Sequence, residues 1–527
     1  MSSRPTPSLA SSLRRVTAAA LVAGLTVALA GCSASSDDDG RTALVTHRQE
    51  ARVTVVGAAS AAERAVETSR ALFTSSPVVV VAPEDDADAQ AEAADDAERL
   101  GVPLLLGPGG VDEGSSAEAD SSSPSTSTPD SSRTTSPAPS LLTGELDRLG
   151  TETVVTAGDV AGVDAPGLEV VTRASSADVP EPATPLDDVL VVVSRADAAA
   201  AATARAAGAE VQTLPDGVTD LQSSGAVVDA LHGSATTDTV LVGSAFAAVR
   251  DPGWSVAAAR SGAQLPGGGQ RFFPDRRFVA LYGAPGTGAL GVLGEQDVAG
   301  TVRRAAEVAA TYDAASDRPV VPMLEIIATV AAGDAGDDGD YSNELSPESI
   351  EPYVDAAADA GQYVVIDLQP GRADFLSQAK RYESLLSKPN VGLALDPEWR
   401  LEPDQVPLRQ IGGVEASEVN AVSTWLADLV ASKGLPPKMF VLHQFRLDML
   451  RDRASIDTSR PELATLIHAD GQGSQPDKQA TWRTLHDGAP VGVAWGWKNF
   501  FDEDAPMLSP EQTLTDVSPT PDLVTYQ

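Results

Sequence analysis

The segment Val391-Gly392-Leu393-Ala394-Leu395-Asp396-Pro397-Glu398-Trp399 decides the fold of the second half of the chain. A short apolar run of strand length ends directly in two carboxylates. Six more runs of this kind follow residue 277, and most end in polar or aromatic residues. We expect these strands at residues 278–283, 320–328, 363–369, 391–396, 439–445, 465–469 and 491–497.

Amphipathic stretches separate these strands. They fit helices over residues 295–314, 347–360, 373–387 and 415–432. Strands that alternate with helices at this spacing predict an α/β fold, a (β/α)8-like (TIM-type) barrel over residues 277–527. An eighth strand is not evident from the sequence.

Functional side chains fall where the predicted strands end. In barrels of this type the carboxyl ends of the strands line the active face. We therefore expect one group of residues to converge at the barrel mouth. Its members are Tyr282, Glu325, Asp367, Gln369, Asp396, Glu398, His443, Gln444, His468, Asp470, Trp495 and Trp497.

Asp396 and Glu398 are the sharpest candidates for catalysis. Residues two apart on a strand face the same side, so both carboxylates point into one cavity if the strand continues that far. Neighbouring carboxylates push their pKa values apart, and glycoside hydrolysis needs one protonated and one charged carboxyl group. Otherwise Pro397 marks the end of the strand, Asp396 caps the following loop and Glu398 is solvated.

The segment 392–399 resembles the D-x-E strand ends of chitinase-like and muramidase-like glycoside hydrolases. The resemblance implies that Glu398 is the general acid and that Asp396 orients it or stabilises charge. Glu325 and Asp367 are then auxiliary carboxylates, and no cofactor or metal is expected.

Aromatic and imidazole groups leave two further interpretations open. Trp495 and Trp497 lie on the same side of the last predicted strand and are either platforms for sugar rings or core residues. Tyr282, Gln369, Gln444 and the histidines would complete a substrate site. Alternatively, His443, His468 and Asp470 hold a zinc ion, as in a metal-dependent deacetylase.

The first half of the chain has a different texture, poor in aromatic residues and rich in Ala, Val and Asp. Short β-branched runs alternate with Ala-rich helical stretches, which predicts a doubly wound parallel-sheet domain or domains over residues 42–262. A strand–helix–strand pattern near residues 78–109 has a looser copy from residue 189 to 243.

This half resembles the cell wall-binding repeat 2 family. The resemblance rests on four segments, Val79-Val80-Val81-Ala82, Gly101-Val102-Pro103-Leu104-Leu105-Leu106, Glu145-Leu146-Asp147-Arg148-Leu149-Gly150 and Val154-Val155-Thr156-Ala157-Gly158. It implies a module that binds the cell wall. The other interpretation is a generic doubly wound domain without a ligand.

Two segments interrupt or join these predicted domains. Residues 111–140 are rich in Ser, Thr, Pro and acidic residues, which predicts a disordered insertion. Residues 263–276, which include Pro266-Gly267-Gly268-Gly269, are the expected linker.

The first 31 residues have the features of an export signal. Arg4, Arg14 and Arg15 precede an apolar stretch over residues 16–30 that is too short to span a bilayer well. The closing residues Leu29-Ala30-Gly31-Cys32 resemble a bacterial lipobox. The resemblance implies cleavage before Cys32, a diacylglycerol on its thiol, and residues 32–41 as a tether. Cys32 is also the only cysteine of the chain.

The formal net charge of −38 argues against nucleic acid as a partner, because phosphates would be repelled. The expected partners are the membrane, through the lipid on Cys32, and a glycan of the cell envelope. The hypothesis is a lipoprotein on the outer face of the cytoplasmic membrane that binds or hydrolyses an envelope polysaccharide. The alternative is a non-catalytic wall-binding scaffold with a degenerate barrel.

Overall fold

The computed structural model describes residues 44–45, 52–109, 140–163, 166–172 and 185–527. The predicted signal, Cys32 and the tether lie outside these ranges, as does the predicted insertion apart from Ser140. Ser140 instead caps a helix, since its side chain accepts a hydrogen bond from the backbone N–H of Thr143. Within the described ranges, no helix has the length and apolar character needed to cross a bilayer.

The first half contains two four-stranded parallel sheets. The first sheet has the order β5-β4-β6-β7, and the second has the order β9-β8-β10-β2. The first three strands of each sheet have the same topology: the strand that comes first in the sequence lies between the second and the third. This shared topology matches the looser repeat in the sequence. The strands are β2 (Val53–Val56), β4 (Val78–Pro83), β5 (Leu104–Gly107), β6 (Thr153–Thr156), β7 (Glu169–Thr172), β8 (Val189–Val193), β9 (Glu210–Thr213) and β10 (Asp238–Val242). A short antiparallel pair, β1 (Leu44–Val45) and β3 (Phe73–Ser75), accompanies them.

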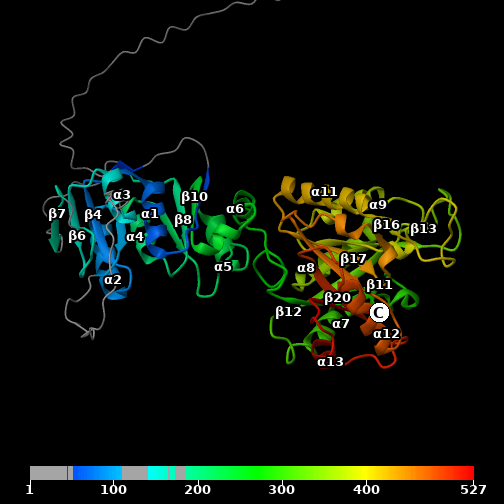
Figure 1. The fold of residues 1–527 in the computed structure, drawn as a ribbon. Coiled ribbons are helices and arrows are strands. Elements are labelled where there is room, and N and C mark those ends of the chain that lie inside the picture. Colours follow the sequence, from blue (N-terminus) through cyan, green and yellow to red (C-terminus); the bar gives the residue numbers. More distant parts are fainter. Residues whose placement is uncertain (1–43, 46–51, 110–139, 164–165, 173–184) are drawn as a thin grey trace, which may run out of the picture. The chain divides into compact units, whose positions relative to one another are not determined.

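Helices cover these sheets and share one core. Helices α1 and α4 contact strands of both sheets, and α2 packs on α4. The second sheet buries Leu190, Val192 and Leu241 on its opposite face against α5 and α6. The helices are α1 (Ala61–Leu72), α2 (Ala87–Leu100), α3 (Leu141–Leu149), α4 (Ala198–Ala206), α5 (Gly225–Gly233), η1 (Ser244–Ala248) and α6 (Pro252–Ser261) (Figure 1).

The second half is a closed barrel of eight parallel strands, which confirms the predicted fold class. The order is β11-β12-β14-β15-β17-β19-β20-β21, and β21 pairs back with β11. The strands are β11 (Arg277–Gly283), β12 (Val320–Ala331), β14 (Tyr363–Leu368), β15 (Val391–Leu395), β17 (Lys438–Gln444), β19 (Leu463–Ala469), β20 (Ala494–Asn499) and β21 (Leu523–Tyr526) (Figure 1). Seven of them match the predicted runs, and β21 is the strand that the sequence did not reveal.

Helices and short strands connect the barrel strands. The helices are η2 (Gly288–Leu290), η3 (Val292–Glu295), α7 (Val298–Ala310), α8 (Pro347–Asp359), α9 (Phe375–Arg381), α10 (Glu383–Leu386), η4 (Pro397–Trp399), α11 (Ala416–Lys433), η5 (Leu447–Met449), η6 (Arg453–Ser455), α12 (Gln475–His486) and α13 (Pro510–Thr515). The short strands are β13 (Ser342–Glu344), antiparallel to the end of β12, and the pair β16 (Val414–Glu415) and β18 (Leu450–Arg451). Strand β17 leads to β19 through η5 and η6 instead of an α-helix, so the barrel is a variant of the regular (β/α)8 pattern.

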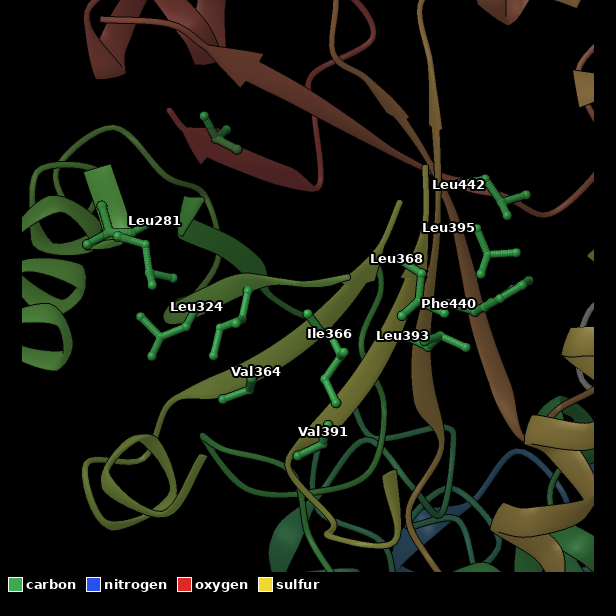
Figure 2. Close-up of a cluster of buried hydrophobic side chains, with 14 of the residues drawn as sticks. Leu281, Leu324, Val364, Ile366, Leu368, Val391, Leu393, Leu395, Phe440 and Leu442 are labelled. Atoms are coloured by element: carbon green, nitrogen blue, oxygen red, sulfur yellow. The ribbon is translucent and has the colours of Figure 1, made fainter. Parts of the chain in front are cut away.

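Side chains alternate along each barrel strand between two cores. Outward positions such as Ile366, Leu393 and Phe440 form the larger core with the helices (Figure 2). Inward positions such as Met323 and Val441 fill the lower barrel with apolar side chains. Because the side-chain period is two, the next inward residue on each strand lies one step closer to the barrel mouth.

Candidate functional site

That next inward position is polar on every strand. We call this set the polar layer. Cross-barrel hydrogen bonds between its members show that they meet in the interior, and all are nearly inaccessible to solvent. The polar layer consists of Tyr282, Glu325, Asp367, Asp396, His443, His468, Lys498 and Thr525, one residue from each strand, with Asp396 directly after β15.

His443 connects the two sides of the polar layer. Its Nε2 lies 2.7 Å from Oε1 of Glu325, and its Nδ1 lies 2.9 Å from Oδ2 of Asp470. Burial alone would lower the pKa of His443, but Glu325, Asp367 and Asp470 outweigh burial and raise it well above its usual value. His443 is therefore an imidazolium held between carboxylates.

His468 differs from His443 although the two residues pair across β17 and β19. Burial and the neighbouring positive charge of His443 lower the pKa of His468 well below its usual value. Its Nε2 lies 3.0 Å from Oγ1 of Thr525. His468 is thus a neutral imidazole.

Tyr282 and Asp367 form the third interaction of the layer. The Tyr282 hydroxyl donates a hydrogen bond to Asp367 Oδ2 at 2.8 Å, and the Gln369 amide lies 3.4 Å from the same hydroxyl. Burial raises the pKa of Asp367 to about 6, against the opposing effect of His443.

Asp396 and Glu398 follow β15, where Pro397 ends the strand and begins η4. Oδ1 of Asp396 accepts a hydrogen bond from the Glu398 backbone N–H at 3.1 Å, so Asp396 does cap the turn. Glu398 is nevertheless only partly exposed, and both residues line the same cavity. The turn therefore keeps the two carboxyl groups on one side, although the strand does not continue through them.

The protonation of the mouth carboxylates separates them into two kinds. Burial, followed by the charge of Asp470, raises the pKa of Glu398 to about 7. Burial also raises the pKa of Asp396 well above its usual value. For Asp470, burial is the largest single effect and acts in the same direction, but the hydrogen bond with His443 and the positive charges of His443 and Lys498 together outweigh it, so the pKa is lowered. Glu398 and Asp470 therefore form an acid and an anion beside one cavity.

The cavity at the barrel mouth has a volume of about 690 Å³. Its polar wall includes Tyr282, Gln369, Asp396, Glu398, Asp470 and Lys498. Its rim is apolar and includes Leu290, Trp399, Leu408, Ile411, Phe445 and Phe500. A cavity of this size with an apolar rim and a few converging polar groups is typical of a small-molecule or saccharide site.

Lys498 is a member of this wall that sequence reasoning missed. Its ammonium lies 3.3 Å from the centre of the Tyr282 ring, and the residue is only 3 % exposed. The alternation along β20 could have identified Lys498 from the sequence. If Trp495 and Trp497 face outward, Gly496 and Lys498 must face inward.

Three of the predicted site residues, Trp495, Trp497 and Gln444, lie neither at the cavity nor in the polar layer. Trp497 is buried in the outer core, Trp495 stacks on His486, and both indoles pack against Trp482 of α12. The amide oxygen of Gln444 accepts a hydrogen bond from Arg453. The two tryptophans do share one side of their strand, but it is the side that faces the helices.

The other nine predicted residues converge. Tyr282, Gln369, Asp396, Glu398 and Asp470 line the cavity, and Glu325, Asp367, His443 and His468 lie in the polar layer.

Comparisons with known proteins add little to this geometry. No family model and no curated protein matches the chain. The complex of xylanase-alpha-amylase inhibitor protein (XAIP-I) with trehalose is similar to 47% of this chain and 92% of its own, with 14% identity and a TM-score of 0.29. Cwp6 from Clostridium difficile is similar to 61% of this chain and 64% of its own, with 11% identity and a TM-score of 0.27. Likenesses at these scores carry no argument about this protein.

Proposed function

We propose that the barrel hydrolyses a glycosidic bond of a cell-envelope polysaccharide, with Glu398 as the general acid and Asp470 as the neighbouring anion. The observation that carries this proposal is that both carboxyl groups open on one cavity while their surroundings differ. His443 donates to Asp470 and holds it charged, whereas no cation is hydrogen-bonded to Glu398 among the described residues.

This division of labour fits the reaction. The Glu398 proton passes to the glycosidic oxygen as the bond from that oxygen to the anomeric carbon breaks, and the leaving sugar departs as an alcohol. Asp470 stabilises the positive charge that develops at the anomeric carbon. Water then adds to this carbon and returns a proton to Glu398.

Of the two roles that the resemblance implies for Asp396, orienting the acid fits its surroundings better than stabilising charge. Burial raises its pKa well above the usual value, which favours the neutral form. Its bond to the Glu398 backbone holds the turn in place. Trp399, on the cavity rim, replaces Trp495 and Trp497 as the candidate platform for a sugar ring.

The cell-envelope location rests on the sequence. The lipobox-like segment ending at Cys32 supports a location on the outer face of the cytoplasmic membrane, and the first half would bind the wall. Labelling cells with a radioactive fatty acid tests the anchor, because the Cys32→Ser variant should lose the label.

The catalytic test uses the purified full-length protein in detergent with peptidoglycan and arabinogalactan fragments. We expect new reducing ends from the wild type, loss of activity in Glu398→Gln, and full activity in Asp404→Asn, an exposed carboxylate outside the cavity lining. Binding without release, unchanged by Glu398→Gln, would overturn hydrolysis and support the scaffold interpretation.

A further inference from the structure

Below the cavity, three buried side chains of the polar layer converge on one point. Oxygen or nitrogen atoms of Glu325, His443 and His468 all lie within 4.8 Å of one another. Each of these side chains has no exposed surface. Two imidazoles and one carboxylate at this spacing are a common donor set for zinc.

Several inward-facing atoms of this cluster lack hydrogen-bond partners. Among the described residues, Glu325 Oε2 and His468 Nδ1 have no partner, and they lie 4.0 Å apart. Asp367 Oδ1 also has no partner, and it lies 3.9 Å from His443 Nε2. Buried polar atoms without partners are destabilising, so two of them facing each other within the cluster, with a third beside His443, indicate a missing ligand.

The outward-facing atoms of the same side chains are all fixed. His443 Nδ1 is bonded to Asp470, His468 Nε2 to Thr525, and Asp367 Oδ2 to the Tyr282 hydroxyl. Metal-binding histidines show this arrangement, because a partner on the second ring nitrogen sets the tautomer and the ring orientation. The contacts therefore leave His468 Nδ1 and Glu325 Oε2 free for a metal ion, and His443 Nε2 contacts only Glu325 Oε1, which belongs to the same cluster.

The charge of the site points the same way. The carboxyl groups of Glu325, Asp367, Asp396 and Asp470 are buried beside Lys498 and two imidazoles. A second buried lysine nearby, Lys478, is already paired with Asp504 at 2.6 Å. Buried charge without compensation is strongly unfavourable, so protons or a cation must balance these carboxylates.

We propose that Glu325, His443 and His468 bind a zinc ion beneath the cavity floor. The ion replaces the proton that His443 Nε2 otherwise shares with Glu325, and this proton leaves to solvent. This set differs from the one expected from sequence, because Asp470 stands behind His443 and does not face the cluster.

The ion has a positioning role. Its three donors do not line the cavity, so it does not touch a substrate there. It holds the His443 ring, and this ring holds Asp470 at the cavity wall. The proposal therefore stands whether or not the barrel hydrolyses glycans.

The test measures metal directly. Full-length protein in detergent is stripped with a chelator, offered Zn²⁺ alone, dialysed, and assayed by elemental mass spectrometry and thermal unfolding. We expect about one tightly held zinc per chain and a higher Tm than that of the stripped protein. Cobalt in place of zinc should give the visible absorption of a low-symmetry site.

Variants assign the site. Glu325→Gln and His468→Gln should lose the zinc and the Tm increase, whereas Glu398→Gln should keep both. The double variant Asp338→Asn and Asp340→Asn disrupts the partly exposed acidic cluster of Asp338, Asp340 and Glu344, and it should also keep the zinc and the Tm increase. If the wild type does not retain zinc, the proposal is overturned. This result does not depend on whether the variants fold. Loss of zinc only in the Asp338 and Asp340 variant would overturn the proposal as well.

Discussion

The protonation of Glu398 leads to a stability prediction that requires no knowledge of the substrate. Glutamine has the shape of a protonated glutamate but does not titrate. Glu398→Gln should therefore leave the free energy of unfolding unchanged in acid and raise it at alkaline pH. The reason is that the wild type must ionise Glu398 in a place that disfavours the charge.

The magnitude follows from the pKa. It is raised from 4.5 to about 7 in the folded protein, a difference of about 3 kcal/mol between the two protonation states. A raised pKa contributes stability that is fully present below the unfolded value of 4.5 and is lost as the pH rises through about 7. The variant should thus match the wild type near pH 4 and exceed it by about 3 kcal/mol near pH 8.

The assay is urea unfolding followed by tryptophan fluorescence. Trp254 is the only tryptophan before residue 277, so the signal reports mainly on the barrel. Asp404→Asn, which removes an exposed carboxylate, serves as the control for the general effect of charge. An equal difference between Glu398→Gln and wild type at both pH values would refute the environment that we assign to Glu398.

Three further predictions follow from other contacts. Lys498→Gln removes a charge that lowers the pKa of Glu398, so the alkaline limb of the pH–rate profile should move up by as much as about one unit. Trp497 is buried, so Trp497→Ala should lower the free energy of unfolding by about 3–5 kcal/mol, measured in urea. Trp399 lines the cavity, so Trp399→Ala should instead weaken glycan binding with little change in stability. Asp197→Ala leaves Arg64, which it contacts at 2.7 Å, buried without its carboxylate, so thermal unfolding should show a loss of about 3 kcal/mol in the first half of the chain.

The fold was largely predictable because buried parallel strands have a strong local signature. Runs such as Val189–Val193 are apolar on both faces, and the helices between them have a clear period. Strand β21 escaped because Leu523–Tyr526 is short and contains an inward threonine and an outward tyrosine, which breaks the apolar run. The division of the first half into two sheets depends on strand pairing between distant segments, which a single sequence does not encode locally.

The membership of the candidate site was predictable for nine of the twelve proposed residues, whereas their roles were not. The positions of His443, Glu325 and Asp470 near the ends of predicted strands were enough to predict that they meet at the barrel mouth. That Asp470 is the charged carboxylate depends on a hydrogen bond between the ends of two different strands. Trp495 and Trp497 were chosen because aromatic residues often bind sugars. The alternation along the strand, however, directs both tryptophans outward and Lys498 inward.

One structural feature underlies both proposals. Along each barrel strand, the inward side chain changes from apolar to polar within a single two-residue step, roughly 6.6 Å of strand length. The apolar layer excludes water from below, so each charge in the polar layer must be balanced by a neighbour, a proton or an ion. His443 couples the polar layer to the cavity, because its ring contacts Glu325 through Nε2 and holds Asp470 at the cavity through Nδ1. Removing zinc should therefore disturb Asp470 and leave Glu398 in place, so that turnover falls while the pKa of the alkaline limb stays near that of Glu398.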